Sequence, residues 1–153
     1  MQQWLLDELV TECDYLLCLT VASQRSQIFE HATQASFSLL QHYRERRVVA
    51  GHSGPFAMRV IDSQSVFAGV AVLAAEAIRL IGDRAHPNAI RTRLEQLAAQ
   101  TCTFIVADDL AHLRQRGFQK GDRSGLLDKM RGAALGLGSL LDVKPVLSVQ
   151  SGA

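Results

Sequence analysis

The fold of this protein follows from one stretch of sequence, Tyr15-Leu-Leu-Cys-Leu-Thr-Val21, and from the segment Ala22-Ser23-Gln24-Arg25-Ser26 that comes directly after it. The first stretch is a nearly continuous apolar run of the length expected for a buried strand of a parallel sheet. From Ile28 to Tyr43, apolar residues recur at steps of three and four, which predicts a helix with one apolar face. Ser23 is the predicted N-cap of this helix, because a serine side chain accepts a hydrogen bond from a free amide of the first turn.

The pattern of strand and helix then repeats. Residues 48–57 contain two glycines and a proline, which indicates a loop. Residues 58–61 predict a short strand that ends at Asp62-Ser63, and the apolar residues 66–81 predict a helix. A further helix opens at Pro87, a residue that suits the first helical position. This alternation predicts an α/β fold, with a parallel sheet, flanking helices and right-handed crossovers.

The last third of the sequence predicts two more strands and two more helices. Residues 102–107 are the first of these strands, and Asp108 or Asp109 is expected to cap a short helix. A loop over residues 116–125 leads to a helix over residues 126–141. Residues 143–149 form the final strand, at an edge or strand start because they contain a proline.

Composition excludes several classes of protein. Hydrophobic residues make up 48% of the 153 residues, charged residues make up 20%, and the net charge is +1. Lys and Arg residues do not cluster as they do in nucleic-acid-binding proteins, so we expect no nucleic acid partner. The most apolar stretch, residues 66–81, contains Glu76 and Arg79 and is shorter than the roughly 20 residues that a membrane helix needs. We therefore expect no stable membrane insertion.

The cysteines and histidines point to a cytoplasmic protein without a metal site. Cys13, Cys18 and Cys102 form no CxxC motif, and an odd number of cysteines without metal-ligand spacing fits a reducing compartment. No signal peptide is evident at the start of the sequence. The five histidines show no metal-ligand spacing, so no metal ion is predicted.

The junction between the first strand and its helix is the strongest candidate site. Ligands of open parallel sheets bind beyond the carboxyl ends of the strands, and the amides at a helix start favour an anion. The hydroxyls of Ser23 and Ser26 would add hydrogen-bond donors for a carboxylate or a phosphate. The alternative interpretation is that Ser23 only caps the helix and that Ser26 faces solvent.

Rival sites have less support. A serine hydrolase triad would combine Ser23, a histidine and Asp62, but the G-x-S-x-G motif is absent. Residues 117–125 contain glycines but lack the GK[ST] ending of a phosphate-binding loop. We predict no catalytic residue and no cofactor.

Four segments resemble, in the same order, the DegV family of bacterial fatty-acid-binding proteins. Residues 19–32, LTVASQRSQIFEHA, are similar to the family's strand–SSGLSGTY–helix segment, and residues 60–66, VIDSQSV, are similar to its VIDS-x-SV segment. Residues 106–113, VADDLAHL, look like its DxLxxL stretch, and residues 135–147, LGLGSLLDVKPVL, look like its LLGSLLNIKPIL stretch. Together the four segments span nearly the whole chain.

The resemblance implies the EDD-type α/β fold of the DegV proteins and a non-catalytic protein that binds a long-chain fatty acid. It also implies a partner, a separate fatty-acid kinase to which the bound acyl carboxylate is presented. Carried over by position, Ser23 falls on the second serine of the SSG motif, which contacts the carboxylate. Thr20 and Ser26 occupy matching polar positions nearby.

An acyl chain also needs an apolar lining, because each buried methylene contributes about 0.8 kcal/mol while the charged head must be satisfied separately. The apolar helix over residues 66–81 is our candidate for this lining. The alternative is ordinary core packing. The predicted tail contacts are Val66, Phe67, Val70 and Leu73.

The chain also departs from the family pattern. DegV proteins are considerably longer, so residues 1–99 are expected to be part of the N-terminal DegV-like domain and residues 100–153 the beginning of a second α+β domain. Where the family usually has Ser and Gly, this sequence has Ala22 and Gln24. These departures motivate a second hypothesis, a truncated, non-binding structural or interaction remnant of the same fold. A truncated chain would expose part of its core, and exposed apolar surface favours self-association. A homo-oligomer is therefore kept as an alternative to a monomer.

Overall fold

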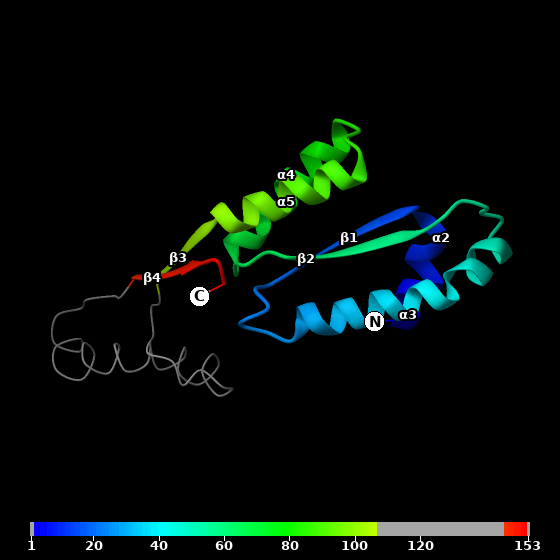
Figure 1. The fold of residues 1–153 in the computed structure, drawn as a ribbon, viewed down its shortest axis with the longest axis horizontal. Helices are drawn as coiled ribbons and strands as arrows, with labels where there is room; N and C mark the ends of the chain where they lie inside the picture. Colours follow the sequence, from blue (N-terminus) through cyan, green and yellow to red (C-terminus); the bar gives the residue numbers. More distant parts are fainter. Residues whose placement is uncertain (1, 107–145, 153) are drawn as a thin grey trace. The chain divides into compact units, whose positions relative to one another are not determined.

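The computed structural model describes residues 2–106 and 146–152 (Figure 1). The chain begins with one continuous helical segment made of α1, η1 and α2, in which η1 is a π-helix. Strands and helices then alternate as far as α4, and a second helix, α5, precedes β3. The elements are α1 (Gln2–Trp4), η1 (Leu5–Leu9), α2 (Val10–Glu12), β1 (Tyr15–Thr20), α3 (Ile28–Val49), β2 (Ala57–Asp62), α4 (Ala68–Gly82), α5 (Pro87–Gln100), β3 (Cys102–Val106) and β4 (Val146–Gln150).

Strands β1 and β2 form the parallel pair that the sequence predicts. Their register runs without interruption from Tyr15 opposite Ala57 to Thr20 opposite Asp62. Strands β3 and β4 pair with each other in a separate two-stranded sheet. The α/β class with a parallel sheet and flanking helices is therefore confirmed.

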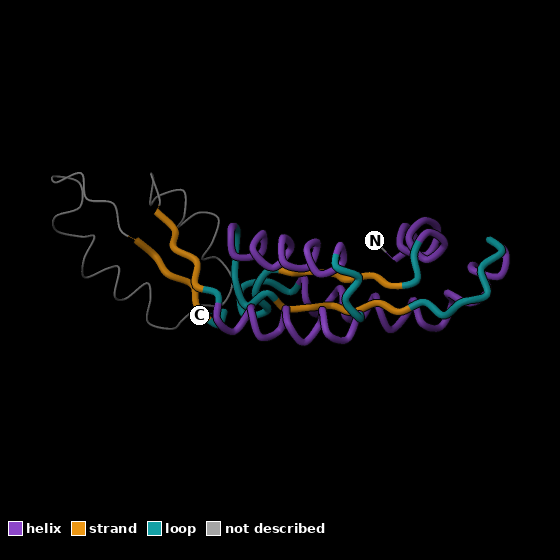
Figure 2. Tube along the Cα trace, turned by 90° about the horizontal axis from the view of Figure 1, so that it is seen from above, coloured by secondary structure: helices purple, strands orange, loops and turns teal. Residues whose placement is uncertain are grey.

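Helices cover both faces of the β1–β2 pair (Figure 1, Figure 2). Alternate side chains of a strand point to opposite faces, and β1 follows this rule. Leu16 and Cys18 pack against one core cluster, whereas Leu17 and Leu19 pack against another. Because both faces are covered, β1 reads as a continuous apolar run rather than an alternating one. Burial raises the pKa of the Cys18 thiol, in accord with a cysteine that packs as a small apolar residue.

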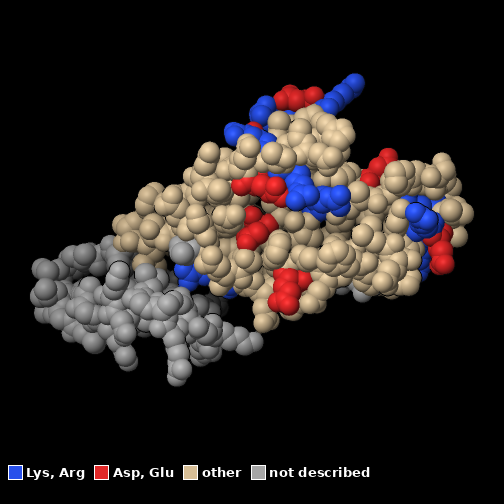
Figure 3. Space-filling model, viewed as in Figure 1, with Lys and Arg blue, Asp and Glu red and all other residues tan. Residues whose placement is uncertain are grey.

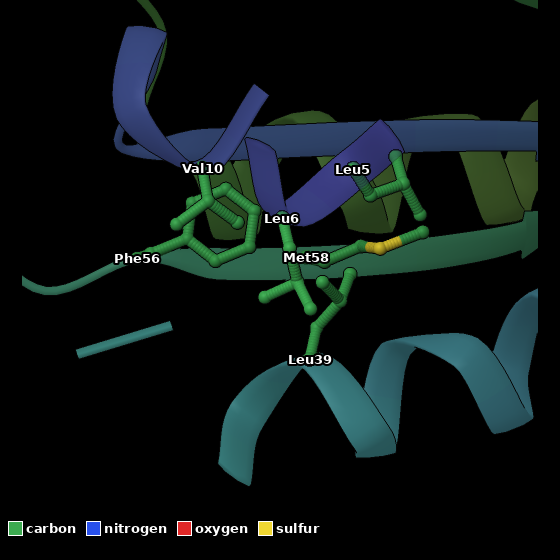
Figure 4. Close-up of a cluster of buried hydrophobic side chains, with 6 residues drawn as sticks. All are labelled: Leu5, Leu6, Val10, Leu39, Phe56 and Met58. Atoms are coloured by element: carbon green, nitrogen blue, oxygen red, sulfur yellow. The ribbon is translucent and has the colours of Figure 1, made fainter. Parts of the chain in front are cut away.

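The first core cluster joins the N-terminal helical segment, α3 and β2 (Figure 4). In the close-up, side chains from these three elements point toward one another around Met58 of β2. The cluster consists of Leu5, Leu6, Val10, Leu39, Phe56 and Met58. The second cluster joins β2 to α4 and α5 and consists of Ile61, Leu73, Ala77, Ile90, Leu94 and Ala98.

Two local predictions are wrong. Ser23 does not cap α3, because residues 23–25 form a separate turn in which the Arg25 amide donates to the Ala22 carbonyl at 2.9 Å, and the helix begins only at Ile28. The loop predicted from residue 48 starts later, because α3 continues to Val49 and its last turn is held by the buried side chain of Arg47.

The chain divides into two compact units, residues 1–103 with 149–153 and residues 104–148. The predicted helix at Asp108 or Asp109, the loop over 116–125 and the helix over 126–141 lie outside the described residues. The predicted domain boundary near residue 100 stays a prediction. Within the described ranges, no helix is both long enough and apolar enough to cross a membrane. On the face drawn in Figure 3, acidic and basic side chains are scattered among uncharged ones.

Candidate functional site

The candidate site lies where β1 and β2 end side by side. Thr20 and Asp62 are the last paired residues of the two strands. Beyond them the two segments that follow the strands stay hydrogen-bonded. The Ser63 amide donates to the Thr20 carbonyl at 3.1 Å, and the Ala22 amide donates to the Ser65 carbonyl at 2.8 Å. The segments that follow the two strands therefore form one connected edge.

The carboxylate of Asp62 bridges these two segments. Both of its oxygens lie 3.2 Å from the amide nitrogen of Ser23, and Oδ1 also accepts a hydrogen bond of 2.8 Å from the amide of Gln64. An Asp side chain that bonds the backbone two residues later forms an Asx-turn. The Ser23 amide thus already has an anionic partner within the chain, so a ligand anion would meet the Ser23 side chain rather than this amide.

The structure places the three predicted carboxylate-binding residues on one segment but in different surroundings. The side chain of Ser23 is exposed, and its hydroxyl has no hydrogen-bond partner among the residues that the structure describes. Thr20 is buried, and its hydroxyl donates to the Ile61 carbonyl at 3.3 Å. The hydroxyl of Ser26 accepts a hydrogen bond of 3.3 Å from the Ile28 amide at the start of α3. Of the three hydroxyls, that of Ser23 is the one without a hydrogen bond among the described residues.

The predicted tail-lining residues are also divided. Leu73 is fully buried in the second core cluster, as the alternative of ordinary core packing expects. Val66 and Val70 are half-buried. Phe67 precedes α4, has a positive φ of 48° and leaves 73% of its surface exposed. Leu73 is therefore a core residue of α4, whereas the other three residues lie nearer the surface.

Sequence reasoning missed a buried hydroxyl pair next to this edge. Ser65 Oγ and Thr103 Oγ1 lie 2.7 Å apart, and Ser63 Oγ both donates to the Ser65 carbonyl and accepts from the Ser65 amide. Gly69 lies against the pair, since a Cβ there would be 2.0 Å from Ser65 Oγ. The segment Asp62-Ser63-Gln64-Ser65 carries the signal, because Asp and Ser side chains bond neighbouring backbone groups in turns. The contact to Thr103 has no sequence signal.

The segment after β4 reaches the same edge. The Gly152 amide donates to the Gln64 carbonyl at 2.8 Å, and Gln24 Nε2 donates to the Ser151 carbonyl at 3.4 Å. Gly152 has a φ of 84° and is buried. This turn belongs to the same compact unit as β1 and β2.

A cavity of about 310 Å³ lies at the other edge of the strand pair, before β2 begins. It is lined by the end of α3 and by the loop from His52 to Pro55, and none of the predicted site residues reaches it. Arg47 in its wall has four partners: it donates to the carbonyls of Val10, Cys13 and Gly54 and forms an ion pair with Asp14. Within residues 2–106 and 146–152, no three histidine, cysteine or acidic side chains group as a metal site would require.

Comparison with known proteins identifies the family. A family model described as "Uncharacterised protein, DegV family" matches residues 1–153. A DegV domain-containing protein from Xanthomonas campestris is 49% identical over 148 residues, which are 96% of this chain and 45% of that protein.

Solved structures show the same fold. A stearic acid-binding protein from Eubacterium ventriosum matches with a TM-score of 0.72 at 21% identity, over 99% of this chain and 44% of that one. DegV from Bacillus subtilis, a fatty acid binding protein, matches with a TM-score of 0.62 at 25% identity, over 99% of this chain and 45% of that one. This chain thus spans a little under half the length of each of these relatives. Because the family model covers every residue and solved DegV-family proteins share the fold, the chain belongs to the DegV family.

Proposed function

We propose that this chain is the part of a fatty-acid-binding protein that holds a long-chain acyl carboxylate at the joined ends of β1 and β2. The proposal is supported by the family and by the two similar solved proteins, which bind stearic acid in one case and fatty acid in the other. The protein binds its ligand without chemical conversion and needs no cofactor. It is cytoplasmic, and the whole protein presents the carboxylate to a fatty-acid kinase.

The observation that carries the proposal is the hydroxyl of Ser23. It lies directly beyond the carboxyl end of β1, it is exposed, and among the described residues it has no partner. A hydroxyl that donates to a carboxylate makes a charge-assisted hydrogen bond, which is shorter and stronger than a neutral one. Ser26 is the second donor, because its oxygen accepts from the Ile28 amide and its own proton stays available. The buried hydroxyl of Thr20 stabilises the end of β1 by donating to the Ile61 carbonyl.

The acyl tail runs along the start of α4. Val66 and Val70 offer half-buried apolar surface there, Phe67 adds an exposed aromatic ring, and Leu73 lies buried in the second core cluster. Burying ten methylenes would contribute on the order of 8 kcal/mol before the costs of association are subtracted. An apolar path beside two hydroxyl donors therefore suits a long acyl chain better than a short, strongly polar ligand.

A second candidate function is a non-binding structural remnant of the fold. Two observations favour it. The Ser23 amide donates to the Asp62 carboxylate, which leaves a ligand fewer donors than an open helix start would. Ala22, where the family has serine, is fully buried and adds no hydroxyl.

Binding of stearate to the delipidated chain, measured by native mass spectrometry and calorimetry, separates the two functions. We expect Ser23→Ala to weaken binding roughly 10- to 100-fold, the loss of one hydrogen bond to a charged group. Ser53→Ala is the matched control, because Ser53 is an exposed serine at the far cavity, and it should leave the affinity unchanged within about twofold. A wild-type chain that binds no stearate favours the structural remnant.

A further inference from the structure

We infer that Asp62 is the positioning residue of this site, which holds the Ser23 turn so that its hydroxyl faces outward. The consequence for ligand binding rests on the proposed function, whereas the bridge itself stands on geometry. The carboxylate bonds the Ser23 amide with both oxygens at 3.2 Å and the Gln64 amide at 2.8 Å. One side chain thus ties the segment after β1 to the segment after β2.

The Gln64 side of the bridge needs this support. Gln64 has a φ of 51°, a left-handed conformation that a residue with a side chain adopts at an energetic cost. Its amide is held by Asp62, and its carbonyl accepts from the Gly152 amide at 2.8 Å. The next residue, Ser65, receives the Ala22 amide at 2.8 Å, which leads back to the Ser23 turn. Both backbone polar groups of Gln64, the amide and the carbonyl, therefore have a partner.

The Ser23 side of the bridge rests on the amide of Ser23 itself. The neighbouring residues of the turn are also held, by the hydrogen bonds from the Arg25 amide to the Ala22 carbonyl and from Gln24 Nε2 to the Ser151 carbonyl, but among the described contacts the Ser23 amide bonds the Asp62 carboxylate alone. With its amide held, the backbone of Ser23 is restrained, which limits the positions that its exposed hydroxyl reaches. Both carboxylate oxygens of Asp62 bond backbone amides, so its effect on a ligand passes through Ser23.

The bridge is tested first without any ligand. An amide proton that is bonded to a carboxylate exchanges with solvent more slowly than a free one, so the Ser23 and Gln64 amides should both be protected in an NMR hydrogen-exchange measurement. Asp62→Ala should raise the exchange rates of both amides. Asp83→Asn removes an exposed carboxylate that pairs with Arg79, and it should leave both rates unchanged. Exchange rates of Ser23 and Gln64 that are the same in the wild-type chain and in Asp62→Ala overturn the bridge.

The positioning role is tested by a double-mutant cycle with stearate as the probe. Asp62→Ala should weaken binding roughly tenfold in the wild-type background but less than about twofold in the Ser23→Ala background, because its effect passes through Ser23. Asp62→Asn keeps one acceptor oxygen and should recover part of the loss. Equal effects of Asp62→Ala in both backgrounds show a merely structural role and overturn the inference. A wild-type chain without stearate binding overturns the proposed function instead, and the amide exchange rates then decide the bridge alone.

Discussion

The hydroxyl oxygens of Ser65 and Thr103 lie 2.7 Å apart, and both side chains are buried. Their hydrogen bond joins the segment after β2 to the start of β3, across 38 residues of sequence. Two buried hydroxyls that satisfy each other avoid the cost of an unpaired polar group. The approach is allowed because Gly69, in the first turn of α4, has no side chain.

Gly69→Ala tests this packing. The new Cβ would lie 2.0 Å from Ser65 Oγ and 2.4 Å from Thr103 Oγ1, so the hydroxyl pair must separate. We expect the free energy of unfolding, measured by urea denaturation, to fall by about 2–4 kcal/mol. The control is Gly82→Ala in the same helix, which has nothing within 4 Å and should gain up to about 1 kcal/mol. Equal stabilities of the two variants would contradict the close contact.

Arg47→Met tests the buried guanidinium at the end of α3. The side chain is 3% exposed and satisfies the carbonyls of Val10, Cys13 and Gly54, which methionine cannot do. Removing one partner from a buried charged network costs about 3–5 kcal/mol. Arg46→Met is the matched control, since Arg46 is half-exposed in a pair with Asp7, and it should cost less than about 1 kcal/mol. The melting temperatures of both variants, compared with that of the wild-type chain, test this difference in stability.

The pH dependence of stability tests the two ion pairs of Glu76, one to Arg79 within α4 and one to Arg93 of α5. Hydrogen bonds from Arg79 and then Arg93 hold the pKa of the Glu76 carboxyl at about 2, below its ordinary value of 4.5. The unfolded chain therefore takes up this proton first as the pH falls, so the stabilisation is complete above pH 4.5 and is lost between pH 4.5 and about 2. Glu76→Gln should flatten the stability profile over this window, and a profile identical to that of the wild type would speak against the pairing.

Leu73→Ala and Phe67→Ala separate core packing from tail contact. Leu73 is fully buried, so its truncation should cost about 2–5 kcal/mol in urea unfolding whether or not ligand is present. Phe67 is 73% exposed, so its truncation should change stability by less than about 0.5 kcal/mol. On the proposed function, Phe67→Ala nevertheless weakens stearate binding. A large loss of stability in Phe67→Ala would show that this side chain belongs to the core.

The sequence predicted the elements well where one physical signal dominated. The apolar run of β1, the second strand and the helix that starts at Pro87 lie within a few residues of their predicted positions. The family followed from four short segments, each a local feature of the chain. The local pattern was misleading at residues 23–27, where Ser23 was predicted to cap α3. The hydroxyl of Ser26, rather than that of Ser23, accepts from the Ile28 amide at the start of α3.

Local chemistry is what the sequence by itself determined: which residues are apolar at strand or helix spacing, and that a hydroxyl follows a buried strand. Only the tertiary structure decided that the Asp62 carboxylate occupies the Ser23 amide, that Ser65 meets Thr103, and that Leu73 lies in the core while Phe67 is exposed. The physical reason is that these contacts join residues 38 or 39 positions apart, or depend on which face of a helix is covered. Such contacts are set by the packing of strands and helices against one another, and residue order alone does not contain them.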